Sequence, residues 1–120
     1  PTTGPVLAFE SLADEPDIGP LLEPLRLEGR LVLVAGPRDN PVLAPAVTPA
    51  LALVPGRAFD HRGSRLGRGG GTFDRVLAGL TCPKIGVAFD CQIVDALPVE
   101  PHDERVDRLI TASFDLEFER

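Results

Sequence analysis

The stretch LVPGRAFDHRGSRLGRGGGTFDR, residues 53–75, indicates how the rest of the chain is arranged. An apolar run ends at Val54, and a loop rich in glycine and arginine follows it. From Thr72 onward, four apolar residues share one face at helical spacing: Phe73, Val76, Leu77 and Leu80. The pattern predicts a strand, a glycine-rich loop and a helix. In α/β sheets ligands bind beyond the carboxyl ends of the strands, which is where this loop would lie.

The glycines of this loop suit a phosphate site. Glycine lacks Cβ, so the backbone can adopt positive φ and turn its N–H groups toward an anion. The helix that begins near Thr72 adds unsatisfied N–H groups and the positive end of its dipole. Arginine side chains can add charge-assisted hydrogen bonds to phosphate oxygens. The predicted phosphate site contains Arg65, Gly67, Arg68, Gly69, Gly70, Gly71, Thr72 and Phe73.

Asp74 stands out in this stretch, because a carboxylate beside a phosphate is repulsive unless a cation lies between them. Magnesium would supply that cation. A second interpretation stays open: the loop is a flexible surface segment, and Asp74 complements the dipole of the helix. The loop is not a P-loop, which ends in Gly-Lys-Ser/Thr, nor a dinucleotide fingerprint, whose glycines directly follow the strand.

The remaining apolar runs predict an α/β fold. Further strands are expected at residues 6–12, 31–34, 50–54, 84–89 and 109–111. After the first strand, Asp17 is suited to cap a helix that Gly29 ends. Residues 114–118 alternate apolar and acidic side chains, as an edge strand does. We expect an open, mainly parallel sheet flanked by helices in three layers, with the strand that ends at Val54 in the centre and a C-terminal edge strand.

Composition and charge limit the kinds of partner that this protein can bind. The 120 residues, 43% hydrophobic and 25% charged, fit one domain over residues 1–120. A net charge of -6 argues against nucleic acid and against a polybasic membrane role. We find no apolar run of membrane-spanning length and no leader pattern, so a cytoplasmic location is expected. Cys82 and Cys91 lack metal-binding spacing, and both are expected to be buried or half-buried.

The quoted stretch and the segment KIGVAFDCQIVDALPVEPHDERVDRLIT, residues 84–111, together resemble the 5-formyltetrahydrofolate cyclo-ligase family, also called methenyltetrahydrofolate synthetase. The family pattern is PG-aFD-G-RLG-G-GYYDR followed by a P-E-hD-VD segment, and both blocks occur here in that order. The resemblance covers roughly the last two thirds of the chain. Members of the family are longer, so we expect this chain to lack their amino-terminal basic helical region and part of the segment around residues 37–49.

The resemblance implies an ATP- and Mg²⁺-dependent ligase that converts 5-formyltetrahydrofolate to 5,10-methenyltetrahydrofolate and releases ADP and phosphate. ATP is the co-substrate and Mg²⁺ the cofactor, reduced folate is the other small-molecule substrate, and a monomer is favoured. Such chemistry needs positioning and charge neutralisation, and no catalytic nucleophile or base is expected. The alternative is a non-catalytic nucleotide- or phosphate-binding relative. A purely structural domain would leave two matching acidic residues unexplained.

The resemblance also assigns roles to single residues. Asp74 and Asp103 match the two carboxylates that bind magnesium in the family. Glu15 matches a first-strand glutamate that contacts the folate, and the other expected substrate contacts are Glu10, Arg68 and Thr72. Glu10 departs from the usual residue type at its position. Thr72 replaces the first tyrosine of Gly-Tyr-Tyr-Asp, in a chain without any tyrosine, so an aromatic face and a phenolic hydroxyl beside the folate are lost.

Overall fold

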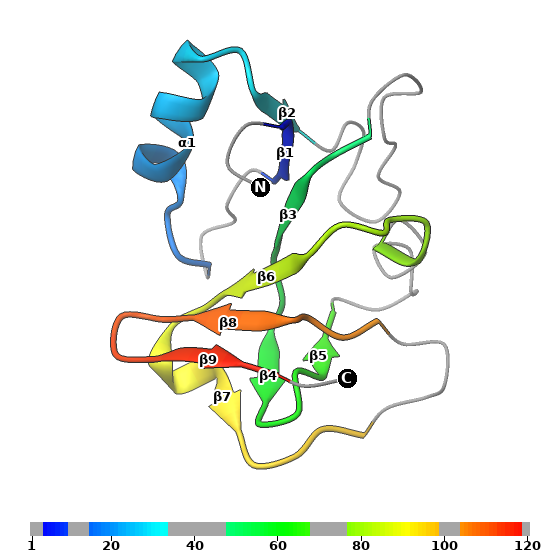
Figure 1. The fold of residues 1–120 in the computed structure, drawn as a ribbon. Helices are drawn as coiled ribbons and strands as arrows, with labels where there is room; N and C mark the ends of the chain where they lie inside the picture. Colours follow the sequence, from blue (N-terminus) through cyan, green and yellow to red (C-terminus); the bar gives the residue numbers. More distant parts are fainter. Residues whose placement is uncertain (1–3, 10–14, 34–47, 68–76, 99–103, 119–120) are drawn as a thin grey trace.

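The chain folds around a six-stranded sheet with the strand order β2-β1-β3-β6-β8-β9 (Figure 1). The computed structural model describes residues 4–9, 15–33, 48–67, 77–98 and 104–118. The strands are β1 (Val6–Ala8), β2 (Leu31–Leu33), β3 (Leu51–Val54), β6 (Lys84–Val87), β8 (Arg108–Ile110) and β9 (Asp115–Glu117). Every neighbouring pair is parallel except β8 and β9, which are antiparallel. The predicted mainly parallel α/β sheet, with a central β3 and a C-terminal edge strand, is confirmed.

Several strands are shorter than predicted: β1 ends at Ala8 rather than at residue 12, β3 begins at Leu51 rather than at Ala50, and β9 covers 115–117 of the predicted 114–118. The expected strand over residues 84–89 ends at Val87, because Phe89 already caps a 3₁₀ helix, η1 (Asp90–Gln92). The strand expected over residues 109–111 lies one residue earlier, as β8, where Arg108 pairs with Ile85. The smaller of these shifts are of the size that fraying ends and short strands produce.

Helix α1 (Gly19–Leu27) follows β1 and precedes β2. Its N-cap residue is Ile18, so the prediction that Asp17 is the N-cap was wrong by one position. The Asp17 carboxylate still accepts a hydrogen bond from the Gly19 N–H at 2.9 Å. Gly29 ends the helical segment as expected, with a φ of 69° that only glycine adopts without strain.

The two faces of the sheet carry separate apolar clusters. Alternate residues of a strand point to opposite faces, so Leu7 joins one cluster and its neighbours Val6 and Ala8 join the other. Ile18 and Leu22 from the α1 region complete the cluster with Val6. The opposite cluster is completed by residues from outside the six strands, among them Phe59, Leu77 and Cys82. Both faces are therefore covered, which explains the nearly continuous apolar runs of β1 and β3.

A second sheet of three short strands lies beside the first, in the order β5-β4-β7 (Figure 1). It contains β4 (Ala58–Asp60), β5 (Arg65–Leu66) and β7 (Ile93–Val94). The loop predicted between Val54 and Thr72 contains β4 and β5 in its described part, so the prediction was wrong there. Strands this short show no usable periodicity, and the parallel partner of β4 is the distant β7. Phe59 of β4 packs over Gly86 of β6, where a Cβ would lie 2.8 Å from the Phe59 Cε1 atom.

The two cysteines differ in their exposure. Cys82 is buried as expected, whereas Cys91 is exposed at the surface of η1, which corrects the expectation for that residue. Within the described residues, no helix has the length and apolar character needed to cross a membrane.

Candidate functional site

The segment that leaves the central strand β3 passes through Pro55 and Gly56 into β4 and folds back at residues 61–64 to form β5. Arg65, on β5, donates a hydrogen bond from Nε to the Pro55 carbonyl at 2.6 Å, and only 7% of this arginine is exposed. A Cβ at Gly56 would lie 2.9 Å from the Phe59 ring and 3.1 Å from Arg65 Cγ. Glycine is therefore required here for close packing, and the Pro-Gly pair holds Arg65 in place at the carboxyl end of β3.

Arg65 and Gly67 are the described members of the predicted phosphate site, and they lie side by side. A Cβ built on Gly67 would be 3.2 Å from Nη2 and 3.4 Å from Nη1 of Arg65. The guanidinium plane therefore borders the backbone at the start of the glycine run. Residues 68–73, which complete the predicted site, lie outside the described residues, so the phosphate assignment stays a prediction.

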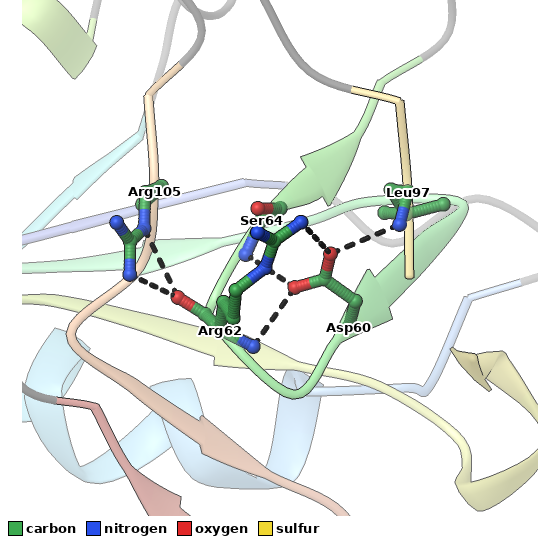
Figure 2. Close-up of polar contacts among 5 residues, drawn as sticks. All are labelled: Asp60, Arg62, Ser64, Leu97 and Arg105. Atoms are coloured by element: carbon green, nitrogen blue, oxygen red, sulfur yellow. Dashed lines mark hydrogen bonds and ion pairs between the residues drawn. The ribbon is translucent and has the colours of Figure 1, made fainter. Parts of the chain in front are cut away.

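Asp60, at the end of β4, is the most deeply engaged carboxylate of the described residues (Figure 2). Its exposed fraction is 0%, and Oδ1 accepts hydrogen bonds from the backbone N–H groups of Arg62 at 2.9 Å and Ser64 at 3.0 Å. Oδ2 accepts a third from the Leu97 N–H at 3.0 Å. Burial raises the pKa of the Asp60 carboxyl, but the three backbone donors and the Arg62 charge outweigh it, and the pKa is lowered.

The turn held by Asp60 contacts a distant segment through its other side. Arg105 donates from Nε to the Arg62 carbonyl at 3.0 Å, and its Nη2 donates to the same oxygen (Figure 2). The next carbonyl, of Gly63, accepts a hydrogen bond from the Val106 N–H at 2.9 Å. Gly63 has a φ of 82°, and a Cβ there would lie 2.6 Å from the Val106 carbonyl oxygen. At Gly63 and Val106 the backbone of the turn is therefore in direct contact with the backbone of the distant segment.

Gln92 ties the carboxyl end of β3 to the turn after β6. Its Nε2 donates to the carbonyls of Gly56 and Arg57, both at 3.1 Å. Its Oε1 accepts a hydrogen bond from the Phe89 N–H at 2.8 Å. One side chain thus holds together the segments that leave two neighbouring parallel strands, which is the edge of the sheet where a ligand site was expected.

Asp90 organises the adjacent turn between β8 and β9. Its two oxygens accept hydrogen bonds from the Ser113 and Thr111 hydroxyls, and Oδ1 also accepts from the Ser113 N–H at 3.2 Å. The Ser113 hydroxyl, followed by the Thr111 hydroxyl, lowers the pKa of the Asp90 carboxyl. Asp90 is exposed, and its role in the structure is to join the ends of β6 and β8.

The amino end of β6 carries an open cavity of about 420 Å³ lined by Thr81, Cys82, Pro83, Lys84 and Asp107. Its charged groups already have partners within the chain. The buried Lys84 donates from Nζ to the Leu80 carbonyl at 3.1 Å, and Asp107 accepts a hydrogen bond from the Lys84 N–H at 2.8 Å. These bonds hold the end of the preceding helical turn against β6 and β8. We therefore assign the pair a structural role.

The remaining predicted site residues are placed only in part. Glu15 is described and is 5% exposed, just before α1. A carboxylate so deeply buried is not the solvated turn residue that its surroundings in the sequence suggest. Glu10, Asp74 and Asp103 lie outside the described residues, so the structure leaves their predicted roles untested. Among the residues that are described, no group of three or more His, Cys, Asp or Glu side chains could hold a metal ion.

Sequence reasoning missed Asp60, Gln92 and Arg105. For Asp60 a signal was present: the order Asp-His-Arg-Gly after an apolar pair is typical of an aspartate that accepts hydrogen bonds from the following turn. For Gln92 and Arg105 there was no local signal, because their partners lie 36 and 43 positions away along the chain.

Fold and site together define an α/β protein whose central parallel strand leads into a partly buried hairpin, rich in glycine and arginine, at the edge of the sheet where folds of this class bind ligands. Comparison with known sequences places it more narrowly. The sequence model of the 5-formyltetrahydrofolate cyclo-ligase family matches residues 27–112, and the chain belongs to this family. The resemblance found in the sequence is confirmed.

Curated relatives are similar in sequence to part of this chain. The 5-formyltetrahydrofolate cyclo-ligase of Mycolicibacterium smegmatis is 44% identical over 61 residues, which are 49% of this chain and 31% of the relative. The protein of the same name from Escherichia coli is 46% identical over 59 residues, which are 47% of this chain and 32% of the relative. The aligned part of the chain thus spans about a third of the length of these two relatives.

Two solved structures share the fold over a larger part. The NMR structure of Aquifex aeolicus 5,10-methenyltetrahydrofolate synthetase superposes with a TM-score of 0.78 at 28% identity, covering 98% of this chain and 73% of that one. The 5,10-methenyltetrahydrofolate synthetase of Mycoplasma pneumoniae superposes with a TM-score of 0.71 at 27% identity, covering 90% of this chain and 73% of that one. The α/β fold is therefore the fold of these synthetases.

Proposed function

We propose that the protein containing this chain converts 5-formyltetrahydrofolate to 5,10-methenyltetrahydrofolate, consuming ATP with Mg²⁺ and releasing ADP and phosphate. The observation that carries the proposal is the set of three hydrogen bonds from Arg105 and Val106 to the carbonyls of Arg62 and Gly63. This turn belongs to the hairpin that leads into the glycine run, and Arg105 lies two positions after Asp103. The contact supports a shared site for the glycine run and Asp103, and family membership over residues 27–112 supports the reaction.

The chemistry suits a site built from backbone and arginine. Transfer of the ATP γ-phosphoryl group to the formyl oxygen creates a leaving group on the formyl carbon. N10 of the folate then attacks that carbon and loses its proton to solvent, and phosphate departs as the five-membered ring closes. Phosphoryl transfer asks the protein chiefly for positioning and charge stabilisation. Arg65, held by the Pro55 carbonyl and bordering Gly67, is a preorganised cation for that task.

The proposed magnesium ligands are Asp74 and Asp103. Carboxylate oxygens are the donors that Mg²⁺ prefers, and two of them with phosphate oxygens make an ordinary site for this ion. When bound, the ion would neutralise charge on the phosphates. In the sequence, Asp74 stands in the first turn of the helix predicted from Thr72, and Asp103 lies two positions before Arg105.

For the folate we propose contacts from Glu15, Glu10, Arg68 and Thr72. Glu15 is the one member of this set that the structure describes, and 5% of it is exposed. Thr72 is smaller than tyrosine and has no aromatic ring, so the fit to the pteridine would differ from that of relatives with Gly-Tyr-Tyr-Asp. The partners we propose are small molecules alone, bound by a cytoplasmic monomer.

The second candidate function is that of a non-catalytic nucleotide- or phosphate-binding relative, and Thr72 is the observation that favours it. One experiment separates the two. The full-length protein is mixed with 5-formyltetrahydrofolate, ATP and Mg²⁺, and the absorbance band of the methenyl product is followed, with ATP omitted as the control. Product that needs all three components supports the ligase. Mg²⁺-dependent ATP binding in calorimetry without product supports the non-catalytic relative, and the absence of both overturns both.

A further inference from the structure

Three successive residues after the central strand β3 each direct a carbonyl at a side-chain donor from another segment. The Pro55 carbonyl accepts a hydrogen bond from Nε of Arg65 at 2.6 Å. The carbonyls of Gly56 and Arg57 both accept from Nε2 of Gln92, at 3.1 Å each. The backbone of these three residues is therefore held from two sides, by β5, which carries Arg65, and by η1, which ends at Gln92.

The side-chain amide of Gln92 has a fixed orientation. Its Oε1 accepts a hydrogen bond from the Phe89 N–H at 2.8 Å, so Nε2 is the group that faces the two carbonyls. The next residue, Ile93, begins β7 and pairs with Phe59 of β4, which places the base of the side chain against the hairpin (Figure 1). A side chain that is fixed both at its base and at its amide oxygen gives firm support to the backbone that it contacts.

The supported backbone is also bonded to the strand that leads into the glycine run. The Arg57 N–H donates to the Leu66 carbonyl at 2.7 Å, and Leu66 directly follows Arg65 in β5. The Arg65 guanidinium borders Gly67, where a Cβ would lie 3.2 Å from Nη2. Gln92 is thus connected through this backbone to the arginine of the proposed phosphate site.

Other interactions hold the same segment, and they limit what the loss of the Gln92 amide would change. Pro55 is fully buried, and Arg65 has a further interaction besides its bond to Pro55. Beyond the segment, the pairing of β4 with β7 fixes the chain. Without the Gln92 amide we therefore expect the hairpin to stay folded and the peptide groups of Gly56 and Arg57 to become mobile.

We propose that Gln92 is a positioning residue of the nucleotide site: its amide holds the backbone after β3 and, through it, the Arg65 guanidinium beside Gly67. The inference rests on the proposed function, because it assigns Arg65 to the ATP phosphates. It adds to that function a residue that acts through the backbone rather than by contact with ATP. Gln92 follows β6, so the nucleotide site depends on a strand other than the one that leads into it.

The test uses Gln92→Glu and Gln92→Ala in the full-length protein, with Cys91→Ala and Asp90→Ala as controls. Glutamate keeps an acceptor for the Phe89 N–H but turns a second oxygen toward the two carbonyls, whereas alanine removes both functions. Cys91 is exposed on the same 3₁₀ helix. Asp90→Ala frees that helix from the turn between β8 and β9 and leaves the Gln92 amide in place, so it shows what general loosening of η1 would do.

In calorimetry with Mg²⁺, both Gln92 variants should bind ATP about three- to fivefold more weakly than the wild type, because hydrogen bonds that hold the binding group are lost. Both controls should match the wild type. In an Arg65→Ala background, Gln92→Ala should cause no further loss of ATP affinity, since its effect acts through Arg65. An equal loss in that background, or the same loss in Asp90→Ala, overturns the proposal.

A second measurement reads the contact without activity. Amide hydrogen exchange at Arg57 should become faster in both Gln92 variants, whereas exchange at Phe89 should become faster only in Gln92→Ala. Faster exchange at Arg57 with unchanged ATP affinity overturns the positioning role, and unchanged exchange at Arg57 overturns the contact itself.

Failure of the proposed catalysis is a separate result. If the wild-type protein forms methenyl product and the Gln92 variants bind ATP as tightly as it does, only the positioning role is overturned. If the wild-type protein binds ATP but forms no product, the ligase reaction is overturned and the calorimetry still decides the role of Gln92. A wild-type protein that binds no ATP with Mg²⁺ overturns the nucleotide site and the positioning role together.

Discussion

At the scale of single residues, Asp60 shows how a buried charge is kept in this fold. Its carboxylate accepts three backbone N–H donors, and the Arg62 guanidinium lies 4.0 Å away. A buried carboxylate without such donors would be protonated or excluded. Burial raises the pKa of the Asp60 carboxyl, but the effect of the hydrogen-bond donors is larger and the pKa is lowered. The ionised form is therefore the one that stabilises the native state.

The first prediction concerns Asp60→Asn. An amide keeps the shape but turns a donor toward one backbone N–H, so we expect a loss of about 1–3 kcal/mol in the free energy of unfolding at pH 7. A carboxyl with a lowered pKa in the folded state stabilises above its unfolded pKa, about 3.9, and loses that contribution as the pH falls through the folded pKa. The difference between wild type and variant should therefore shrink below about pH 4 in urea titrations. A difference that stays constant with pH would contradict this reading.

The second prediction tests Arg65 against Arg57, an exposed arginine of the same hairpin. Arg65→Ala should weaken ATP binding at least several-fold in calorimetry, since a charge-assisted bond is worth about 1.5–3 kcal/mol. Arg57→Ala should leave the affinity unchanged. Arg65 also bonds the Pro55 carbonyl, so thermal unfolding of both variants is measured in parallel. Lower stability with unchanged ATP affinity would assign Arg65 to the structure alone.

At the scale of elements, the β4–β5 hairpin is shaped by the residues at its turn. Gly63 and Gly29 both have positive φ, at 82° and 69°. Their surroundings differ: a Cβ at Gly63 would meet the Val106 carbonyl oxygen at 2.6 Å, whereas nothing lies within 4 Å of a Cβ at Gly29. Substituting each glycine in turn therefore separates the energetic cost of backbone strain from the cost of close packing.

The third prediction uses this pair. Gly29→Ala carries only the cost of a left-handed conformation, about 1–2 kcal/mol. Gly63→Ala should lose about 1–3 kcal/mol more, because the methyl group must displace the segment at Val106. Urea unfolding at pH 7 gives both values. Equal losses would mean that the contact between turn and segment relaxes without cost.

At the scale of the whole molecule, the proposed site joins segments that are far apart in the chain. The glycine run follows β5, and Asp103 precedes β8. The sheet brings the flanks of these segments together through the parallel pairs β3–β6 and β6–β8 and through the turn at Arg62. A shared ligand would couple the two segments energetically.

The fourth prediction measures that coupling. Asp74→Asn and Asp103→Asn should each raise the Mg²⁺ requirement for ATP binding in calorimetric titrations. The double variant should lose much less than the sum, because either change already breaks the shared site. Asp115→Asn, which removes an exposed carboxylate bound to Arg108, is the control and should have no effect. Additive losses that do not depend on Mg²⁺ would mean that the two aspartates act separately.

Much of the architecture could be read from local pattern. The apolar runs of β1, β2, β3 and β6, the alternation in β9 and the stop at Gly29 depend on residues close together in the chain. Periodicity and turn chemistry report such features directly. The family could also be recognised from two motif blocks in the right order, and the match over residues 27–112 confirmed it.

The interior of the hairpin could not be read in this way. Asp60 and Arg65 stand in a stretch rich in glycine and polar residues, which predicts exposure, yet both are buried. Asp60 is held in part by a bond from Leu97, and Gln92 in η1 bonds Gly56; these partners lie 37 and 36 positions away. Pattern within a short window carries no information on such partners. Burial of a polar group is favourable only when the whole fold supplies its hydrogen bonds, so these positions were decided by packing between distant segments.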